Sequence, residues 1–168
     1  WIFIIILKIM KLFITSKIEK NLEFEKIQID NLSKIKIDGD FSLVLDGQKV
    51  LIACKNTQYT INVASDFFTV SFVEVVEFLR PLLQDSGIKK IMYDAKSIMH
   101  QTKTYINNYF DVKLAAYLLD VNLKIESLAD FCSEFGYKIE DAAYALLVES
   151  KEQIIQLEKD QLSSLYYD

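Results

Sequence analysis

The sequence predicts an α/β fold built on one mixed sheet, and two features of its patterning carry this prediction. Between residues 40 and 63, three short apolar runs follow one another through tight turns, as in an antiparallel meander. After residue 70, apolar residues at helical spacing alternate with short extended runs, as in strand–helix units. The chain has 168 residues, of which 51% are hydrophobic, so it is long enough to form one domain with a proper core.

The meander is expected to contain three strands. Residues 41–45 are strand-like and end at Asp46-Gly47, a dipeptide that favours a hairpin turn. The second strand is expected over residues 49–54 and the third over residues 59–63. Tight turns between consecutive strands place them antiparallel to one another.

The second half of the chain is expected to alternate between helices and two further strands. The helices are predicted over residues 70–83, 95–106, 113–119, 126–135 and 139–162, and the strands over residues 89–93 and 110–112. Pro81 is expected to bend or fray the last turn of the first helix, and Gly136 to cap the fourth. Glu149 and Gln153 are expected on the solvent side of the last helix. This order of elements suits a ribonuclease H-like fold with flanking helices.

The charge balance argues against a surface that binds nucleic acid by itself. Lys and Arg number 19 against 24 Asp and Glu, which gives a net charge of −5, and no basic stripe is visible. Proteins that bind nucleic acid usually carry such a stripe, because neutralising phosphates supplies most of the affinity. We therefore expect any DNA contact to be weak, or to be made by another part of a larger protein.

The cysteines and the single histidine indicate neither a disulfide framework nor a zinc site. Cys54 and Cys132 lie in apolar surroundings and are interpreted as buried thiols of a reducing, cytoplasmic environment. His100 is the only histidine and there is no Cys-x-x-Cys motif, which excludes the usual zinc ligand sets. His100 is interpreted as an ordinary half-exposed histidine rather than a general base.

The chain begins with an apolar run, residues 1–7, that Lys8 and Lys11 interrupt. A bilayer span needs about 20 apolar residues, so the run is too short and no membrane partner is expected. We interpret it as a cut end or a buried segment of a larger chain, with a membrane anchor as the lesser alternative.

Two stretches of the sequence resemble the 3′–5′ proofreading exonuclease domain of bacterial, family A DNA polymerase I. They are Lys89-Lys-Ile-Met-Tyr-Asp-Ala-Lys96 and Phe110-Asp-Val-Lys-Leu-Ala-Ala-Tyr-Leu-Leu-Asp120. At the second, the family typically reads phenylalanine-aspartate-threonine-methionine-leucine-alanine-alanine-tyrosine-leucine-leucine-aspartate. Residues 125–130 resemble the helix that follows, and residues 165–168 resemble the junction with the polymerase domain. The resemblance covers residues 40–168, so residues 1–39 would belong to the end of the 5′-nuclease region and a connector.

Active members of that family hydrolyse the 3′ terminal phosphodiester with two metal ions about 3.5–4 Å apart. They need an Asp-x-Glu pair in a first motif, an aspartate in a second, and an aspartate four residues after a tyrosine in a third. The resemblance places Val44 and Asp46 at the first motif, so that one acid is missing.

The second and third motifs also lack their acids in this alignment. Asp94-Ala-Lys-Ser-Ile98 places Ile98 at the aspartate position, with Asp94 early, at the strand end, and expected to point elsewhere. In the third motif Tyr144 is followed four residues later by Val148, or by Ser150 in a shifted alignment. We expect Val44, Ile98 and Val148 (or Ser150) to meet at one end of the sheet, with at most one of four metal ligands left.

The resemblance therefore implies a degenerate, non-catalytic domain, a form known from polymerase I enzymes of the Bacillus and Clostridium type. It implies no catalytic residue, no cofactor and no metal in this domain, with Mg²⁺ only in the parent polymerase domain. The implied role is to space and support that polymerase domain, and Tyr166 and Tyr167 are expected to pack against it. Asp111, although it matches the family phrase, is expected to cap the helix that follows it.

Two other hypotheses stay open at this point. The first is an active two-metal 3′–5′ exonuclease that uses substitute acids such as Asp46, Asp94 and Glu149, although the count of ligands argues against it. The second is a free-standing ribonuclease H-like interaction module that is not part of a polymerase.

Overall fold

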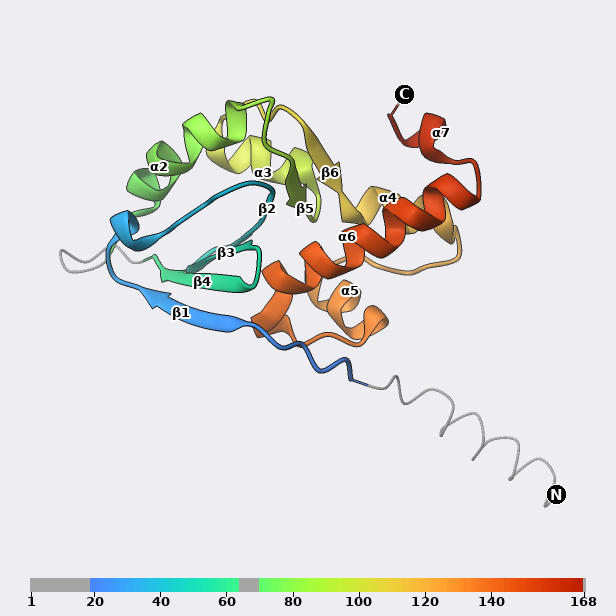
Figure 1. Cartoon of the computed structure of the whole chain (residues 1–168), viewed down its shortest axis with the longest axis horizontal. Coiled ribbons are helices and arrows are strands. Elements are labelled where there is room, and N and C mark those ends of the chain that lie inside the picture. Colours follow the sequence, from blue (N-terminus) through green and yellow to red (C-terminus); the bar gives the residue numbers. More distant parts are fainter. Residues whose placement is uncertain (1–18, 64–69, 168) are drawn as a thin grey trace, which may run out of the picture.

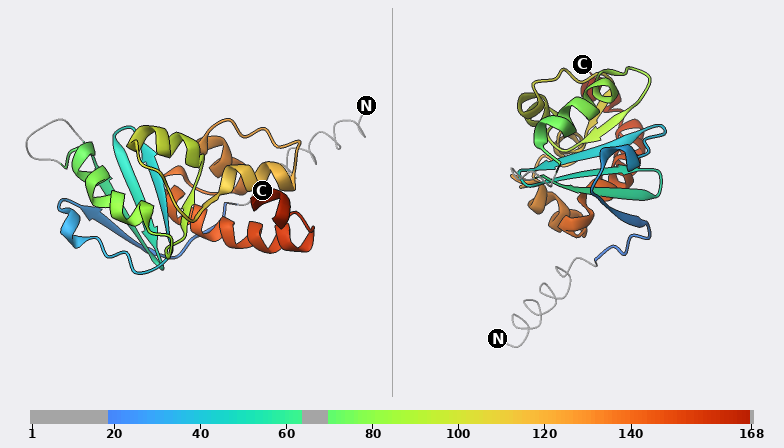
Figure 2. Two further views of the ribbon diagram at one scale, coloured as in Figure 1. Left: turned by 90° about the horizontal axis from the view of Figure 1, so that it is seen from above. Right: turned by 90° about the vertical axis from the view of Figure 1, so that its left-hand side faces the viewer.

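The computed structural model describes residues 19–63 and 70–167, which form a six-stranded sheet with helices on both faces (Figures 1 and 2). The strands are β1 (Glu25–Ile29), β2 (Phe41–Asp46), β3 (Lys49–Cys54), β4 (Thr57–Asn62), β5 (Lys90–Met92) and β6 (Tyr109–Asp111). The α-helices are α2 (Phe72–Gln84), α3 (Ala95–Thr102), α4 (Val112–Leu119), α5 (Leu128–Phe135), α6 (Ala142–Lys159) and α7 (Ser163–Tyr167). Two 3₁₀ turns, η1 (Leu32–Lys34) and η2 (Ile139–Asp141), complete the order.

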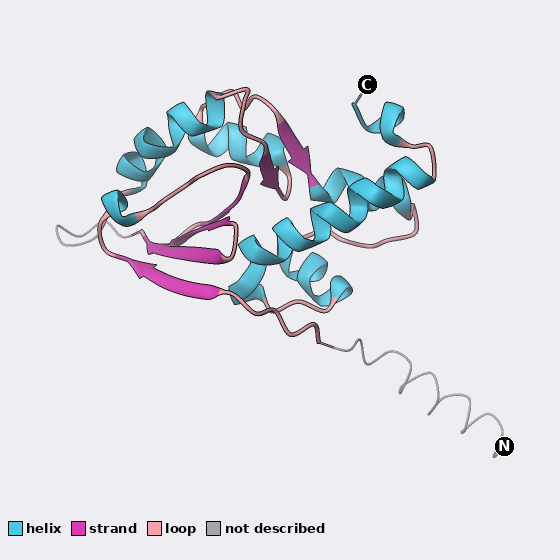
Figure 3. Ribbon diagram, in the orientation of Figure 1, coloured by secondary structure: helices cyan, strands magenta, loops and turns pink. Residues whose placement is uncertain are grey.

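The order of strands across the sheet is β1-β4-β3-β2-β5-β6 (Figure 3). The predicted meander is confirmed, because β3 pairs antiparallel with both β2 and β4. The two later strands are parallel to β2, since β5 pairs with β2 and β6 pairs with β5. This mixed sheet with flanking helices confirms the predicted ribonuclease H-like fold class.

Both faces of the sheet are covered because both faces of its central strands are apolar. In β2, Phe41 and Leu43 pack in the cluster that includes α2 and α3, whereas Val44 packs in the cluster that includes α4, α5 and α6. Ser42 is the one polar side chain in this buried stretch, and its hydroxyl donates to the Ala143 carbonyl at the start of α6. The hydrogen bond satisfies a buried polar group and fixes where α6 meets the sheet.

Strand β1 was not expected from the sequence. It pairs in parallel with β4, from Glu25 beside Thr57 to Ile29 beside Ile61. Ile29 is the only residue of β1 that is fully buried, so the strand lacks the clear apolar alternation that predicts a half-buried strand. The assignment of residues 1–39 to a 5′-nuclease region and connector stays a prediction.

The apolar run at residues 1–7 lies outside the residues that the structure describes. Within the described ranges, no helix has the length and apolar character needed to cross a bilayer.

Two predicted helices end earlier than expected. The helix that was predicted to reach residue 106 ends at Thr102, because Lys103 has a φ of 49°. The last predicted helix is a 3₁₀ turn followed by α6, which ends at Lys159; Gln161, whose φ is 60°, lies in the break before α7. The predicted cap at Gly136, with a φ of 77°, is confirmed, and α2 continues through Pro81 to Gln84.

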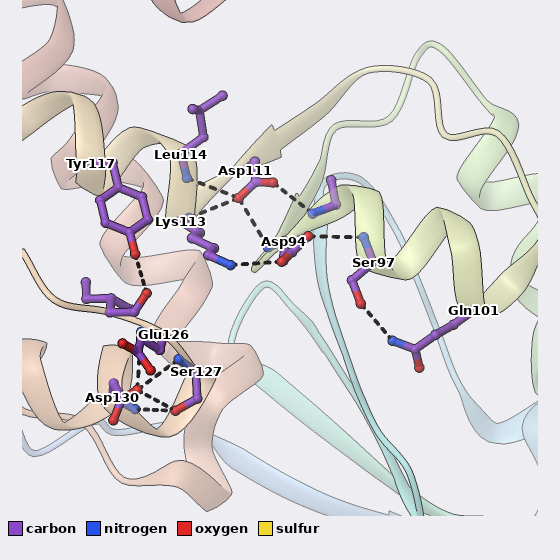
Figure 4. Close-up of polar contacts among 12 residues, drawn as sticks. Asp94, Ser97, Gln101, Asp111, Lys113, Leu114, Tyr117, Glu126, Ser127 and Asp130 are labelled. Atoms are coloured by element: carbon purple, nitrogen blue, oxygen red, sulfur yellow. Dashed lines mark hydrogen bonds and ion pairs between the residues drawn. The ribbon is translucent and has the colours of Figure 1, made fainter.

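Asp111 ties together three elements at one edge of the sheet (Figure 4). As predicted, its carboxylate caps α4 by accepting from the backbone amides of Lys113 and Leu114, at 3.0 and 3.3 Å. The same carboxylate accepts from the amides of Asp94 and Ala95 at the start of α3, at 3.2 and 2.8 Å. One side chain at the end of β6 therefore caps two helices.

We expect Asp111→Ala to lower the free energy of unfolding by about 2–4 kcal/mol, since a helix cap contributes about 1–2 kcal/mol and Asp111 serves two helices. Ser71→Ala is the matched control, because Ser71 caps α2 alone; it should cost about 1 kcal/mol. Urea unfolding followed by circular dichroism measures both values. An Asp111→Ala cost no larger than that of Ser71→Ala would contradict the double capping role.

Candidate functional site

The carboxyl ends of the parallel strands β2, β5 and β6 lie at the same edge of the sheet. Asp46 ends β2, Asp94 follows β5 by two residues, and Asp111 ends β6. In α/β sheets this edge is where ligands usually bind, because loops and helix N-termini converge there. These three aspartates are therefore the first candidates for residues of a functional site.

Two adjoining depressions open at this edge, and both are lined by Val44 and Leu128. We call them together the Val44 hollow. The other side chains that line it are those of Leu43, Leu45, Asp46, Lys49, Leu51, Thr60, Tyr93, Asp94, Ser97, Ile98, Gln101, Ile139 and Glu140. The hollow therefore combines apolar side chains from the sheet and helices with polar side chains around them.

The structure brings two of the predicted motif positions to this hollow. Val44 and Ile98 line the same part of it, and both are buried. Asp46 lines the adjoining part but is exposed, because it is the last residue of β2 before the hairpin turn. The position at which the resemblance implies a strand carboxylate is thus filled by a buried valine.

Asp94 is also among the residues that line the hollow, and the expectation that its side chain points away from the motif stays a prediction. Its backbone is left-handed, with a φ of 59°, and its carboxylate caps α3 by accepting from the amide of Ser97 at 3.1 Å. Lys113 lies against it, with Nζ 2.9 Å from Oδ2 (Figure 4). Hydrogen bonding to Lys113 lowers the pKa of Asp94 and raises the pKa of Lys113. The charge of Asp94 is therefore balanced within the domain.

Val148 and Ser150 are not among the residues that line the two depressions, and the meeting of Val44, Ile98 and Val148 (or Ser150) stays a prediction. Ser150 is buried and donates to the Leu147 carbonyl within α6. Tyr144 donates to Asn56 at the turn between β3 and β4. That turn is at the opposite end of β2 from Asp46, because Phe41 pairs with Cys54 and Asp46 with Lys49.

The sequence contains another tyrosine with the spacing of the third motif, and it was missed. Tyr137 is the one tyrosine in the chain that has an aspartate, Asp141, four residues later. Asp141 is buried and forms an ion pair with Lys26 of β1. The neighbouring residues Ile139 and Glu140 line the same depression as Asp46, but Asp141 itself does not and is held by Lys26. A search for the spacing itself, without a fixed alignment, would have found the pair.

Glu149 is buried, so its predicted place on the solvent side of the last helix is wrong. Only 4% of the residue is exposed, and Gln153, one turn further on, is equally buried. The Glu149 carboxylate accepts from the Tyr137 hydroxyl at 2.8 Å and faces Lys20 Nζ at 3.4 Å. Burial raises the pKa of the Tyr137 hydroxyl, which keeps it protonated as a donor. These partners are distant in sequence, so helical periodicity could not reveal them.

The remaining reactive side chains offer no nucleophile or metal site among the residues that the structure describes. Cys54 and Cys132 are buried free thiols, as predicted, and burial raises the pKa of Cys132 to about 12. His100 is exposed on α3. Within residues 19–63 and 70–167, no three His, Cys, Asp or Glu side chains are close enough together to hold a metal ion.

Comparison with solved structures supports the fold. The chain is similar to a structure described as the POL domain of Pol1 from M. smegmatis in complex with DNA primer-template and dNTP, with a TM-score of 0.54 and 20% identity over 75% of this chain. That match covers 25% of the Pol1 chain, so the present chain spans about a quarter of its length. It is also similar to Brucella melitensis NrnC, with a TM-score of 0.53 and 18% identity over 87% of this chain and 86% of NrnC.

No curated protein sequence matches the chain. A family model does match, and its description is "DNA polymerase I, ribonuclease H-like domain". The match runs over residues 46–144 and so includes the hairpin after β2, the stretch around Asp111 and the residues that line the Val44 hollow other than Leu43, Val44 and Leu45. Because it spans more than half of the 168 residues, the chain belongs to the family of ribonuclease H-like domains of DNA polymerase I.

Proposed function

We propose that this chain is a non-catalytic, 3′–5′ exonuclease-like structural domain of a cytoplasmic DNA polymerase I, which serves DNA replication and repair. One observation carries the proposal. The acidic side chains at or near the motif positions are replaced by apolar residues, are paired with lysines of the same domain, or stand exposed and apart. In this proposal the partner is the polymerase domain of the same chain, and DNA is contacted mainly through that domain.

The residues present do not fit the metal pair that the family uses. Two ions about 3.5–4 Å apart need several carboxylates that point to one place. Here Asp94 is paired with Lys113, Asp141 is paired with Lys26, and Asp46 is exposed at a hairpin. We therefore place Mg²⁺ chemistry in the parent polymerase domain and none in this one.

Lys113 supplies a positive charge at the sheet edge where β2, β5 and β6 end, so this edge needs no bound cation. It stands where the family phrase typically has methionine, at the first turn of α4. Its ammonium group lies 2.9 Å from Asp94 and 5.4 Å from the centre of the Tyr93 ring. The ammonium group of Lys113 thus places a positive charge of the protein itself beside Asp94, whose residue lines the hollow.

We expect Lys113→Met to destabilise the domain at neutral pH, with a difference from the wild type that shrinks in acid. The pKa of Asp94 is lowered in the folded state, mainly by Lys113, so the pair stabilises the fold above the unfolded value of about 4. This contribution is lost as the pH falls through the lower, folded value. Urea unfolding of both proteins between pH 7 and pH 3 measures the difference. A difference that stays constant over this range would show that the charge pair does not stabilise the fold.

We expect the full chain to bind no catalytic metal pair and to leave 3′ ends intact. Calorimetry with Mg²⁺ or Mn²⁺ at sub-millimolar concentrations should give no binding heat, because too few carboxylates converge to offset dehydration of the ions. Incubation with 3′-labelled single-stranded DNA should give no shortening. Manganese-dependent loss of single nucleotides that Asp46→Ala abolishes would instead establish the active-exonuclease hypothesis.

The surface proposed to meet the polymerase domain lies around α7. Tyr166, which was expected to contribute to it, is instead used within the domain, where its ring stacks on Phe110 at 4.8 Å. Leu165 and Tyr167 are 60% and 65% exposed, and Leu114 on the neighbouring α4 is also exposed. Apolar side chains gathered in this way favour contact with another protein surface.

In the parent polymerase, we expect Leu165→Ala combined with Tyr167→Ala to separate the unfolding of this domain from that of the polymerase domain. A change of about 2 kcal/mol is expected, since burying one such side chain contributes about 1.5–3 kcal/mol. Differential scanning calorimetry resolves the two transitions. Val73→Ala is the control, because Val73 is 68% exposed on α2, on the other face of the sheet. If both transitions of the double variant are the same as those of the wild type, Leu165 and Tyr167 do not form the contact with the polymerase domain.

A further inference from the structure

Residues 19–29, which we call the strap, run from α5 and α6 to the edge of the sheet. At its start, the Lys20 amide donates to the Gly136 carbonyl at 2.7 Å, just after α5. In its middle, the Phe24 ring stacks on Tyr144 of α6, with centroids 4.2 Å apart. Its end is β1, which pairs only with β4 among the described strands. Figure 1 shows the strap passing beneath the beginning of α6 before it joins the sheet.

The strap supplies the counter-charge of a buried carboxylate on α6. The Glu149 side chain is 5% exposed, and Lys20 Nζ lies 3.4 Å from its Oε2. The same ammonium donates to the Tyr137 hydroxyl at 2.9 Å and lies 4.6 Å from the centre of that ring. Removing the cation that faces a buried carboxylate strongly destabilises a fold, so losing this contact should cost more than losing an ion pair on the surface.

A second lysine of the strap makes a similar contact six residues later. Lys26 pairs with Asp141, whose side chain is 11% exposed, at the start of α6. Two lysines of one short segment thus form ion pairs with two mostly buried carboxylates. Lys20 and Lys26 themselves are 39% and 55% exposed, so water and salt reach the cationic half of each pair.

We propose that the strap is an ion-pair latch, which closes on Glu149 and Asp141 and opens as a unit while the rest of the domain stays folded. The inference goes beyond the proposed function, because it concerns how residues 19–29 are held against the rest of the domain. When the latch is closed, Lys20 and Lys26 hold the strap against α6.

Independent opening follows from where the strap lies in the sheet. Glu25, Lys26 and Gln28 are exposed, so Ile29 and the half-buried Ile27 are the apolar side chains with which β1 packs against the core. If β1 dissociates from the sheet, the whole length of β4 remains paired with β3. Segments with few buried contacts open at a lower free energy than the core does. Salt should promote the opening, since at 1 M ionic strength charges are screened over about 3 Å.

Hydrogen exchange of the full chain tests the latch. In the double variant Lys20→Gln with Lys26→Gln, we expect amides of β1 to exchange at least tenfold faster than in the wild type. Amides of β2, β3 and α2 should be unchanged. The control is Lys34→Gln, because Lys34 pairs with Asp30 and both side chains are exposed. Raising NaCl from 0.05 to 1 M should speed exchange of β1 in the wild type but have little effect in the double variant.

Two outcomes would overturn the proposal. Exchange of β1 that is unchanged in the double variant would show that the lysines do not hold the strap. Faster exchange throughout the sheet would show that the strap is part of the global fold and has no opening of its own. Glu149→Gln keeps a hydrogen-bond acceptor for Tyr137 but removes the charge that Lys20 faces, while Lys26 keeps its partner Asp141; β1 should therefore exchange faster than in the wild type but more slowly than in the lysine double variant.

Discussion

The carboxylate of Asp111 is the contact on which the carboxyl edge of the sheet depends. It lies at the end of β6 and accepts hydrogen bonds from the first amides of both α3 and α4. Because α3 begins there, Asp94 is fixed at the rim of the Val44 hollow; because α4 begins there, Lys113 is placed within 2.9 Å of it. The match of Asp111 to the family phrase therefore has a structural explanation that requires no metal.

Lysines of the same chain balance two carboxylates of this domain. A carboxylate is costly to keep partly buried unless a positive charge is near. Lys113 meets this need for Asp94 and Lys26 meets it for Asp141. Val44, which the resemblance places at the first motif, is buried and apolar and needs no such partner.

Local patterns in the sequence were enough to predict most of the fold. The Asp46-Gly47 turn predicted the hairpin, and apolar spacing predicted the helices on both faces. Predictions failed where structure depends on distant partners. Glu149 looks like a solvent-facing residue of a helix, but Lys20 and Tyr137 bury it. Strand β1 is mostly exposed and is held by β4, so its own residues carry only a weak signal.

The candidate site was harder to predict than the fold because a motif fixes spacing along the chain and not direction in space. Val44 and Ile98 line one hollow, whereas Val148, on α6, is not among the residues that line it. Tyr137 and Asp141 have the spacing of the third motif, but both are bound by the strap, through Lys20 and Lys26. The same acidic residue type can thus serve catalysis in one member of a fold and hold a neighbouring segment in another. In this chain Asp141 holds a neighbouring segment, because Lys26 of that segment pairs with it.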